Sequence, residues 1–191
     1  MNSAGKFVVI GASAGCLEAL SNILPALPSN YPFPVLIVVH LPSDRDSLIA
    51  ALLNERSEII VKEAEDKESI LPGHAYFAPP DYHMMVERDE TISLSVDDQI
   101  LYSRPSIDVL FESAADALGD RVVGVILTGA NNDGAAGLAL IEAEGGEALV
   151  QDPGTAFSSA MPTAALRTCR NARKLTIPGI ASYLKDLGTL C

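Results

Sequence analysis

The sequence lacks several features that would assign it to a particular class of protein. It has no tryptophan and only three cysteines, Cys16, Cys169 and Cys191, which are widely spaced. An odd number of distant cysteines argues against a disulfide framework and favours a reducing compartment, so we expect a cytoplasmic protein. No histidine and cysteine residues have the spacing of zinc ligands, and we expect no metal site.

Basic charge and long apolar runs are also scarce. Lysine and arginine number 13 against 25 acidic residues, which gives a net charge of −12. Such a charge repels nucleic-acid phosphates and disfavours anionic lipid, so we expect no nucleic-acid partner. No apolar run reaches the roughly 18 residues of a transmembrane helix, and the first six residues do not resemble a signal peptide. We therefore expect no insertion into the membrane.

The residues that are present indicate a globular α/β protein. Hydrophobic residues make up 48% of the 191 positions, enough for the core of one domain. Strand-like and helix-like patterns alternate along the chain, which predicts a doubly wound, mostly parallel sheet. The expected strands are 7–11, 34–40, 58–61, 121–128 and 147–150, and the expected helices are 16–26, 47–56, 106–118, 134–144, 161–169 and 177–187.

The alternation breaks between residues 72 and 102. Turn signals there surround three short runs, His74–Ala78, His83–Glu87 and Thr91–Val96. These runs are typical of antiparallel hairpin strands, and we expect them to extend one end of the parallel sheet. His74 and His83 have no partner at ligand spacing, so we expect both on the hairpin surface.

Three of the apolar strands end beside a residue that can take part in acyl transfer. Strand 7–11 is followed by Ser13, strand 34–40 ends at His40, and strand 121–128 precedes Asp133. The carboxyl ends of parallel strands form the edge where α/β sheets bind ligands. A nucleophile, a general base and an orienting acid that meet there would make a hydrolase site.

The serine turn, Gly11–Gly15, admits three interpretations. It satisfies the G-x-S-x-G nucleophile elbow, but an α/β-hydrolase has its elbow after several strands and its histidine last, whereas here His40 precedes Asp133. It also approaches a dinucleotide-binding turn, although His40 stands where an acidic residue would bind ribose. The third interpretation is a Ser-His-Asp site on a different α/β frame, with the amides of the following helix stabilising an oxyanion.

Each of the three residues also has a purely structural interpretation. Ser13 and Asp133 could cap the helices that follow them, and His40 could be an edge histidine with satisfied hydrogen bonds. The functional hypothesis rests on all three lying at strand ends.

The same segments resemble the catalytic domain of the bacterial chemoreceptor protein-glutamate methylesterase (CheB) family, over nearly the whole chain. The motifs that carry the resemblance are Gly11–Gly15, His40–Pro42, Pro72–Pro80 with His83, Arg104–Phe111, Leu127–Gly137, Gln151-Asp152 and Met161-Pro162. The resemblance implies one methylesterase-like catalytic domain over residues 1–191, with Ser13 as nucleophile, His40 as base and Asp133 as its orienter. It implies no metal and no organic cofactor.

The family hydrolyses methyl esters on chemoreceptor glutamates and deamidates certain receptor glutamines. The resemblance therefore implies the methylated cytoplasmic domain of a chemoreceptor as partner, in chemotaxis signalling. The alternative is a catalytically weak module that binds receptors or signalling partners on the same scaffold. The first strand begins at about residue 7, so we expect no receiver domain, and control would come from a partner or fused regulatory domain.

The chain departs from the family pattern around the site. Ala14 replaces a threonine, Cys16 a glycine, and Ala130-Asn131 a Met-Gly pair. The implied oxyanion donors are backbone amides near Ala14 and Ala130, and alanine keeps its N–H group. The changed side chains are expected to reshape the pocket.

Three further residues are candidates near the site. Arg104 could bind a substrate carboxylate or pair with Asp108 on the same helix. The resemblance implies that Met161 lies near the site. Cys16, in the first turn of a helix, could be a reactive thiol but is better explained as a small packing residue.

Overall fold

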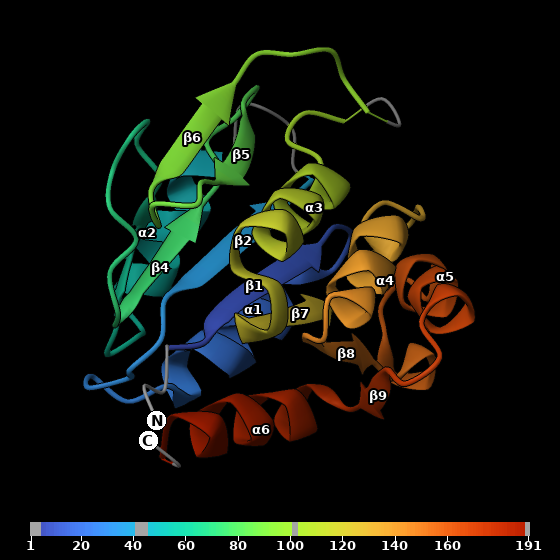
Figure 1. Ribbon diagram of the computed structural model, residues 1–191. Helices are drawn as coiled ribbons and strands as arrows, with labels where there is room; N and C mark the ends of the chain where they lie inside the picture. The colour runs from blue at the N-terminus through green and yellow to red at the C-terminus, as the bar shows by residue number, and fades with distance from the viewer. Residues whose placement is uncertain (1–4, 41–45, 101–102, 190–191) are drawn as a thin grey trace.

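The structure is a computed structural model that describes residues 5–40, 46–100 and 103–189. Seven strands form one sheet in which each adjacent pair is parallel, in the order β3-β4-β2-β1-β7-β8-β9 (Figure 1). Their bounds are β1 Phe7–Ala12, β2 Val35–Val39, β3 Ile60–Glu63, β4 His74–Phe77, β7 Val122–Ile126, β8 Glu147–Gln151 and β9 Arg173–Leu175.

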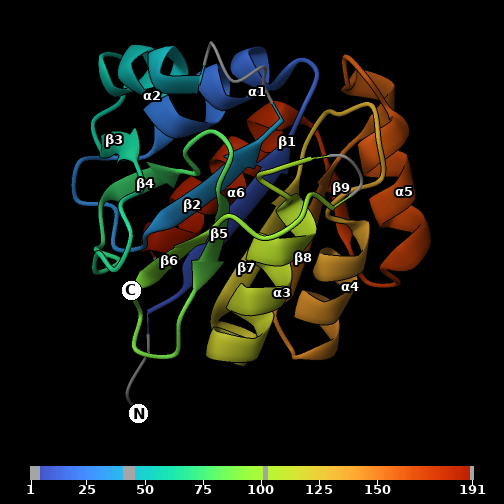
Figure 2. The same ribbon diagram turned by 90° about the horizontal axis from the view of Figure 1, so that it is seen from above.

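Helices cover both faces of this sheet, as expected for a doubly wound fold. One face carries α1 (Cys16–Ile23), α2 (Asp46–Asn54) and α6 (Ile177–Thr189), and the other carries α3 (Ile107–Leu118), α4 (Ala135–Ala143) and α5 (Ala160–Thr168). Figure 2 shows α1 and α2 on the opposite side of the sheet from α3 and α4. Short 3-10 turns occur at Leu24–Ala26, Gly119–Arg121 and Pro153–Thr155.

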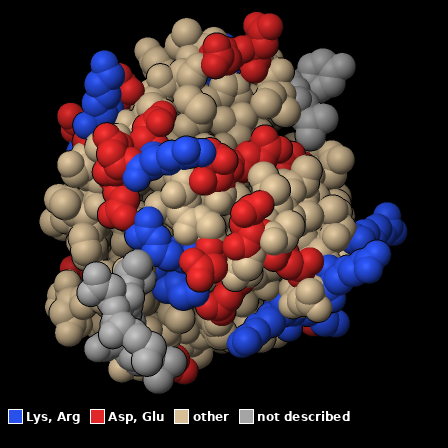
Figure 3. Space-filling view, viewed as in Figure 1, with Lys and Arg blue, Asp and Glu red and all other residues tan. Residues whose placement is uncertain are grey.

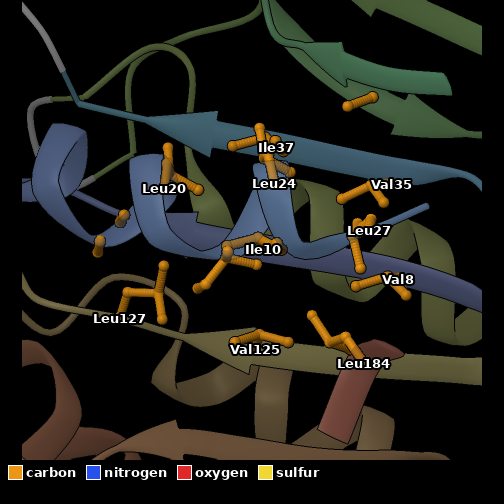
Figure 4. Close-up of a cluster of buried hydrophobic side chains, with 14 of the residues drawn as sticks. Val8, Ile10, Leu20, Leu24, Leu27, Val35, Ile37, Val125, Leu127 and Leu184 are labelled. Carbon is orange, nitrogen blue, oxygen red and sulfur yellow. The ribbon is translucent and has the colours of Figure 1, made fainter. Parts of the chain in front are cut away.

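The central strands are apolar along their whole length because both of their faces are buried. Successive side chains of β1 point to opposite faces, so Val8 and Ile10 enter one core while Phe7 and Val9 enter the other. Figure 4 shows the first core, in which β1, β2 and β7 pack against α1 and α6. Two cores on either side of one sheet hold the strand ends in a fixed register.

The predicted antiparallel extension is present as a separate two-stranded sheet of β5 (His83–Val86) and β6 (Ile92–Ser95). The prediction that His74–Ala78 belongs to that hairpin was wrong. That run forms β4, a parallel strand between β3 and β2, and its Ala75, Tyr76 and Phe77 are buried. The chain passes from β3 to β4 without a helix, so the strand-helix alternation that signals a parallel pair is missing there.

One strand was not predicted at all. β9, Arg173–Leu175, has three residues, of which two are exposed and charged, and it pairs with β8 at the edge of the sheet. Charged side chains are common on edge strands because they discourage pairing with other chains. β9 was missed because these three residues carry no apolar pattern.

The surface reflects the acidic composition. In the view of Figure 3, acidic side chains are spread over the middle and top, while basic ones lie at the upper left, in the centre, below the centre and at the lower right. In the part of the chain that the structure describes, no helix has both the length and the apolar character to span a membrane.

Candidate active site

The serine turn is held at the centre of the sheet edge. After β1 ends at Ala12, the N–H of Ser13 donates to the carbonyl of Thr128 at 2.9 Å, and the N–H of Cys16 donates to the carbonyl of Ser13 at 2.9 Å. Gly15 has φ +85°, and a Cβ there would lie 2.6 Å from Cβ of Phe157. Glycine is therefore required at this position for both backbone and space.

His40 lies on the neighbouring strand end, and its N–H donates to the carbonyl of Ala12 at 3.1 Å. Its Nε2 is 2.8 Å from Oδ2 of Asp133, although the two residues are 93 positions apart in the chain. The expected proximity of His40 and Asp133 is confirmed. Because an ionised carboxylate only accepts hydrogen bonds, Nε2 carries a proton, and in the neutral imidazole Nδ1 then presents the lone pair.

Asp133 does not cap the helix that follows it, contrary to the structural interpretation. The N-cap of α4 is Gly134, whereas the Asp133 carboxylate reaches the start of α3. It accepts the N–H groups of Ile107 at 2.7 Å and Asp108 at 3.0 Å, and the hydroxyl of Ser106 at 3.0 Å. The position of the Asp133 carboxylate is thus fixed by the start of α3, although Asp133 itself lies just before α4.

These hydrogen bonds keep Asp133 ionised. Burial alone would raise the pKa of the Asp133 carboxyl, but the hydrogen bonds from His40, Asp108 and Ile107 outweigh it and lower the pKa below the usual value. A carboxylate held in this state orients the imidazole and stabilises its protonated form.

His83 is not the surface residue that the sequence predicted. Its side chain is buried, Nδ1 accepts the N–H of Ser106 at 3.2 Å, and Nε2 donates to the carbonyl of Asp98 at 3.1 Å. His83 therefore accepts the N–H of Ser106 at the start of α3, next to the N–H groups of Ile107 and Asp108 that bind Asp133. His74, in contrast, is partly exposed and stacks on Tyr76.

Asn131 is a site residue whose contacts the sequence did not reveal. Its Nδ2 lies 3.3 Å from Nδ1 of His40, and its Oδ1 accepts the N–H of Asp133 at 3.2 Å. The only signal in the sequence was that an asparagine stands where the family has a glycine.

Hydrogen bonds of Thr128 and Gln151 support the serine turn. The Thr128 hydroxyl donates to the carbonyl of Ala14 at 2.7 Å and accepts the N–H of Ser158 at 2.9 Å. The Thr128 N–H donates to Oε1 of buried Gln151 at 2.8 Å. The turn after β1 and the loop after β7 are therefore one connected unit.

The remaining predicted site residues occupy different places. Among the described residues, the backbone N–H groups of Ala14 and Ala130 donate no hydrogen bond within the protein. Met161 is buried against Gly129, to whose carbonyl its N–H donates at 3.0 Å. Arg104 does not pair with Asp108 in the part of the chain described, since its Nη1 donates to the carbonyls of Val96 and Asp97.

A cavity of about 690 Å³ opens beside the serine turn. Ser13 and His40 line it together with the apolar side chains of Leu48, Ile49 and Leu52 from α2. Within the described ranges, no cluster of three or more histidine, cysteine or acidic side chains could hold a metal ion. Cys16 is buried in the first turn of α1, in agreement with a packing role.

Comparison with known proteins identifies the family to which this site belongs. The family model for CheB methylesterase matches residues 8–184. The chain belongs to the CheB methylesterase family. The crystal structure of the Thermotoga maritima CheB methylesterase catalytic domain superposes with a TM-score of 0.91 at 33% sequence identity, and the match covers 96% of this chain and 99% of that one.

Relatives of this family differ in length. A Leptospira interrogans protein is 45% identical over 174 residues, which are 91% of this chain and 90% of that protein. The protein-glutamate methylesterase/protein-glutamine glutaminase of Escherichia coli K12 is 42% identical over 167 residues, 86% of this chain but only 48% of the relative. The chain thus spans about half the length of the longer relatives.

Proposed function

We propose that this protein is a serine hydrolase that removes methyl esters from glutamate side chains of chemoreceptors, in chemotaxis signalling, and that it also deamidates receptor glutamines. The observation that carries the proposal is the 2.8 Å contact between His40 and Asp133 at the strand ends that flank Ser13, in a chain of the CheB methylesterase family. Hydrolysis needs no cofactor in this scheme.

The proposed reaction begins with attack by Ser13 Oγ on the ester carbonyl carbon. The hydroxyl proton passes to Nδ1 of His40, since Nε2 is engaged with Asp133. The N–H groups of Ala14 and Ala130, which have no acceptor within the described protein, would stabilise the oxyanion.

The tetrahedral intermediate then breaks its bond to the leaving group. Methoxide takes the proton from His40 and leaves as methanol, and a glutamine substrate would release ammonia in the same way. Water attacks the glutamyl ester of Ser13 with His40 again as base. The products are a receptor glutamate and the free hydroxyl of Ser13.

The cavity suits one side chain delivered by a protein. Its apolar wall on α2 includes Leu48, which is 68% exposed and can contact a receptor surface beside the reacting group. We propose the methylated cytoplasmic domain of a chemoreceptor as partner, and a partner or fused domain as regulator. We propose that Arg104 contacts carboxylates on the receptor surface and has no further role in the reaction. We propose that Met161 supports the loop after β7 through its contact with Gly129.

The direct test measures methanol release from receptor carrying labelled methyl esters. The wild-type chain should release methanol, and Ser13→Ala should not. If the wild-type chain binds methylated receptor but releases no methanol, it acts as a binding module and the proposed hydrolysis is wrong.

A further inference from the structure

The lone pair of the histidine base is already occupied in this structure. Nε2 of His40 donates to Asp133, so Nδ1 is the nitrogen that must accept a proton from Ser13. The group beside Nδ1 is the side-chain amide of Asn131, at 3.3 Å. Within the described residues, Ser13 Oγ makes no hydrogen bond with His40.

The orientation of the Asn131 amide follows from its other contact. The backbone N–H of Asp133 can only donate, so the Asn131 atom 3.2 Å from it is the oxygen. The nitrogen therefore faces His40, and its N–H donates to the Nδ1 lone pair. The Asn131 amide is thus held at its oxygen by the N–H of Asp133 and at its nitrogen by Nδ1 of His40.

We propose that Asn131 is a restraining residue, whose side-chain amide competes with Ser13 for Nδ1 of His40 and must move away before the serine is deprotonated. This inference rests on the proposed function. The same amide opposes the next step, because a protonated Nδ1 would point its N–H at the N–H of Asn131. It also occupies the position beside Nδ1 where the leaving group must collect its proton.

A restraining role and a supporting role predict opposite results. If Asn131 supported the imidazole, its removal would slow the reaction. If it competes with Ser13, Asn131→Ala and Asn131→Gly should accelerate it by about two- to tenfold, the range set by loss of one neutral hydrogen bond. The gain should fall on kcat and leave KM nearly unchanged, since Asn131 acts on the base.

The experiment uses the whole chain and two readouts. The first is the rate at which a fluorophosphonate probe labels Ser13, which requires the base but no receptor. The second is methanol release from methylated receptor. Asn132→Ala is the matched control, because Asn132 is exposed and adjacent, and its side chain makes no hydrogen bond in the described protein.

A third variant separates competition from loosening of the loop. Asn131→Asp keeps an oxygen for the N–H of Asp133 but replaces the donor beside Nδ1 with an acceptor, which would hold a proton on that nitrogen. Ser13 should be labelled more slowly in Asn131→Asp than in wild type, and faster in Asn131→Ala. A loosened loop would instead change the labelling rate of both variants in the same direction.

The outcomes distinguish this inference from the proposed function. Faster labelling of Asn131→Ala and Asn131→Gly, with Asn132→Ala unchanged, supports the restraining role even if no variant releases methanol, in which case only the proposed substrate is wrong. Equal or slower labelling of both variants, with normal methanol release by wild type, overturns the restraining role and leaves the proposed function standing.

Discussion

Asp108 and Asp133 make reciprocal hydrogen bonds between the N-terminal ends of α3 and α4. Asp133, just before α4, accepts the N–H of Asp108 in the first turn of α3, while the Asp108 carboxylate accepts the N–H of Gly137 in α4 at 2.7 Å. Both carboxylates therefore lie at positive helix ends, where negative charge is stabilised. These reciprocal bonds tie the orientation of Asp133, the proposed orienter of His40, to the packing of α3 against α4.

Replacement of Ser13 tests the nucleophile without disturbing the fold. Ser13→Ala should abolish methanol release and labelling by a fluorophosphonate, and its thermal unfolding should match wild type because the hydroxyl makes no hydrogen bond in the described structure. The exposed Ser159 provides the control, and Ser159→Ala should keep full activity. Labelling that persists in Ser13→Ala would identify another nucleophile.

Asp133→Asn should reduce both activity and stability. The rate should fall by about 10⁴-fold, because the amide no longer fixes the imidazole tautomer. Its NH₂ group would also face donors at the start of α3, at a cost of about 1–3 kcal/mol in the free energy of unfolding. Methanol release measures the rate, and urea unfolding measures the free energy of unfolding. A variant with normal kcat would show that Asp133 has no role in the mechanism.

The stability of the protein should depend on pH through Asp108. Burial raises the pKa of the Asp108 carboxyl to about 6, with the charge of Asp133 adding to the effect, above its ordinary value of about 3.9. A raised folded-state pKa gives stability that is complete below pH 4 and is lost as pH rises through 6. Asp133, with its lowered pKa, contributes stability that is lost only in more acidic solution.

Asp108→Asn isolates this effect. The unfolding temperature of the variant minus that of wild type should be larger at pH 8 than at pH 4.5. At pH 8 wild type buries a charged Asp108 carboxylate, whereas the amide of the variant has no charge to bury. Asp116→Asn on the exposed face of the same helix is the control and should show no such trend. Parallel curves for wild type and Asp108→Asn would show that Asp108 does not titrate in this range.

Thr128→Val should weaken the support of the serine turn. Valine keeps the shape but loses the hydroxyl that joins the carbonyl of Ala14 to the N–H of Ser158, and a displaced turn should slow labelling of Ser13 by about ten- to a hundredfold. In the described structure the Thr168 hydroxyl bonds only within α5, so Thr168→Val should label like wild type. Equal rates for both variants would mean that the turn does not need this brace.

We also expect acetyl phosphate to leave the activity of the 191-residue chain unchanged, since we propose that these residues form one catalytic domain without a receiver. The measurement is methanol release with and without the phosphodonor. A large activation would place a phosphorylation-dependent control within this chain.

The sequence predicted the parts of the site that depend on strand ends. Ser13, His40 and Asp133 follow long apolar runs, and such runs identify buried parallel strands whose carboxyl ends must meet. It failed where a residue acts on a distant element. Nothing near His83 or Asp133 indicates that both bind the first turn of α3, because those contacts span 23 to 27 positions and depend on tertiary packing.

Short strands were the other source of error. Four residues of β4 and three of β9 carry too little pattern to separate a parallel strand from a hairpin strand or a loop. The contact of Asn131 with His40 was beyond prediction for a related reason, since it depends on the side-chain rotamer of one loop residue.

The central position of β1 has a consequence for how the protein is made. During synthesis β1 can pair with β2 early, but its other neighbour, β7, is produced more than half a chain later, and Ala14 and Thr128 are 114 positions apart. Until then one edge of β1 is an open template for pairing with other chains. The nascent protein should therefore need protection from aggregation between the synthesis of β2 and that of β7, and esterase activity should appear only after β7 has paired with β1.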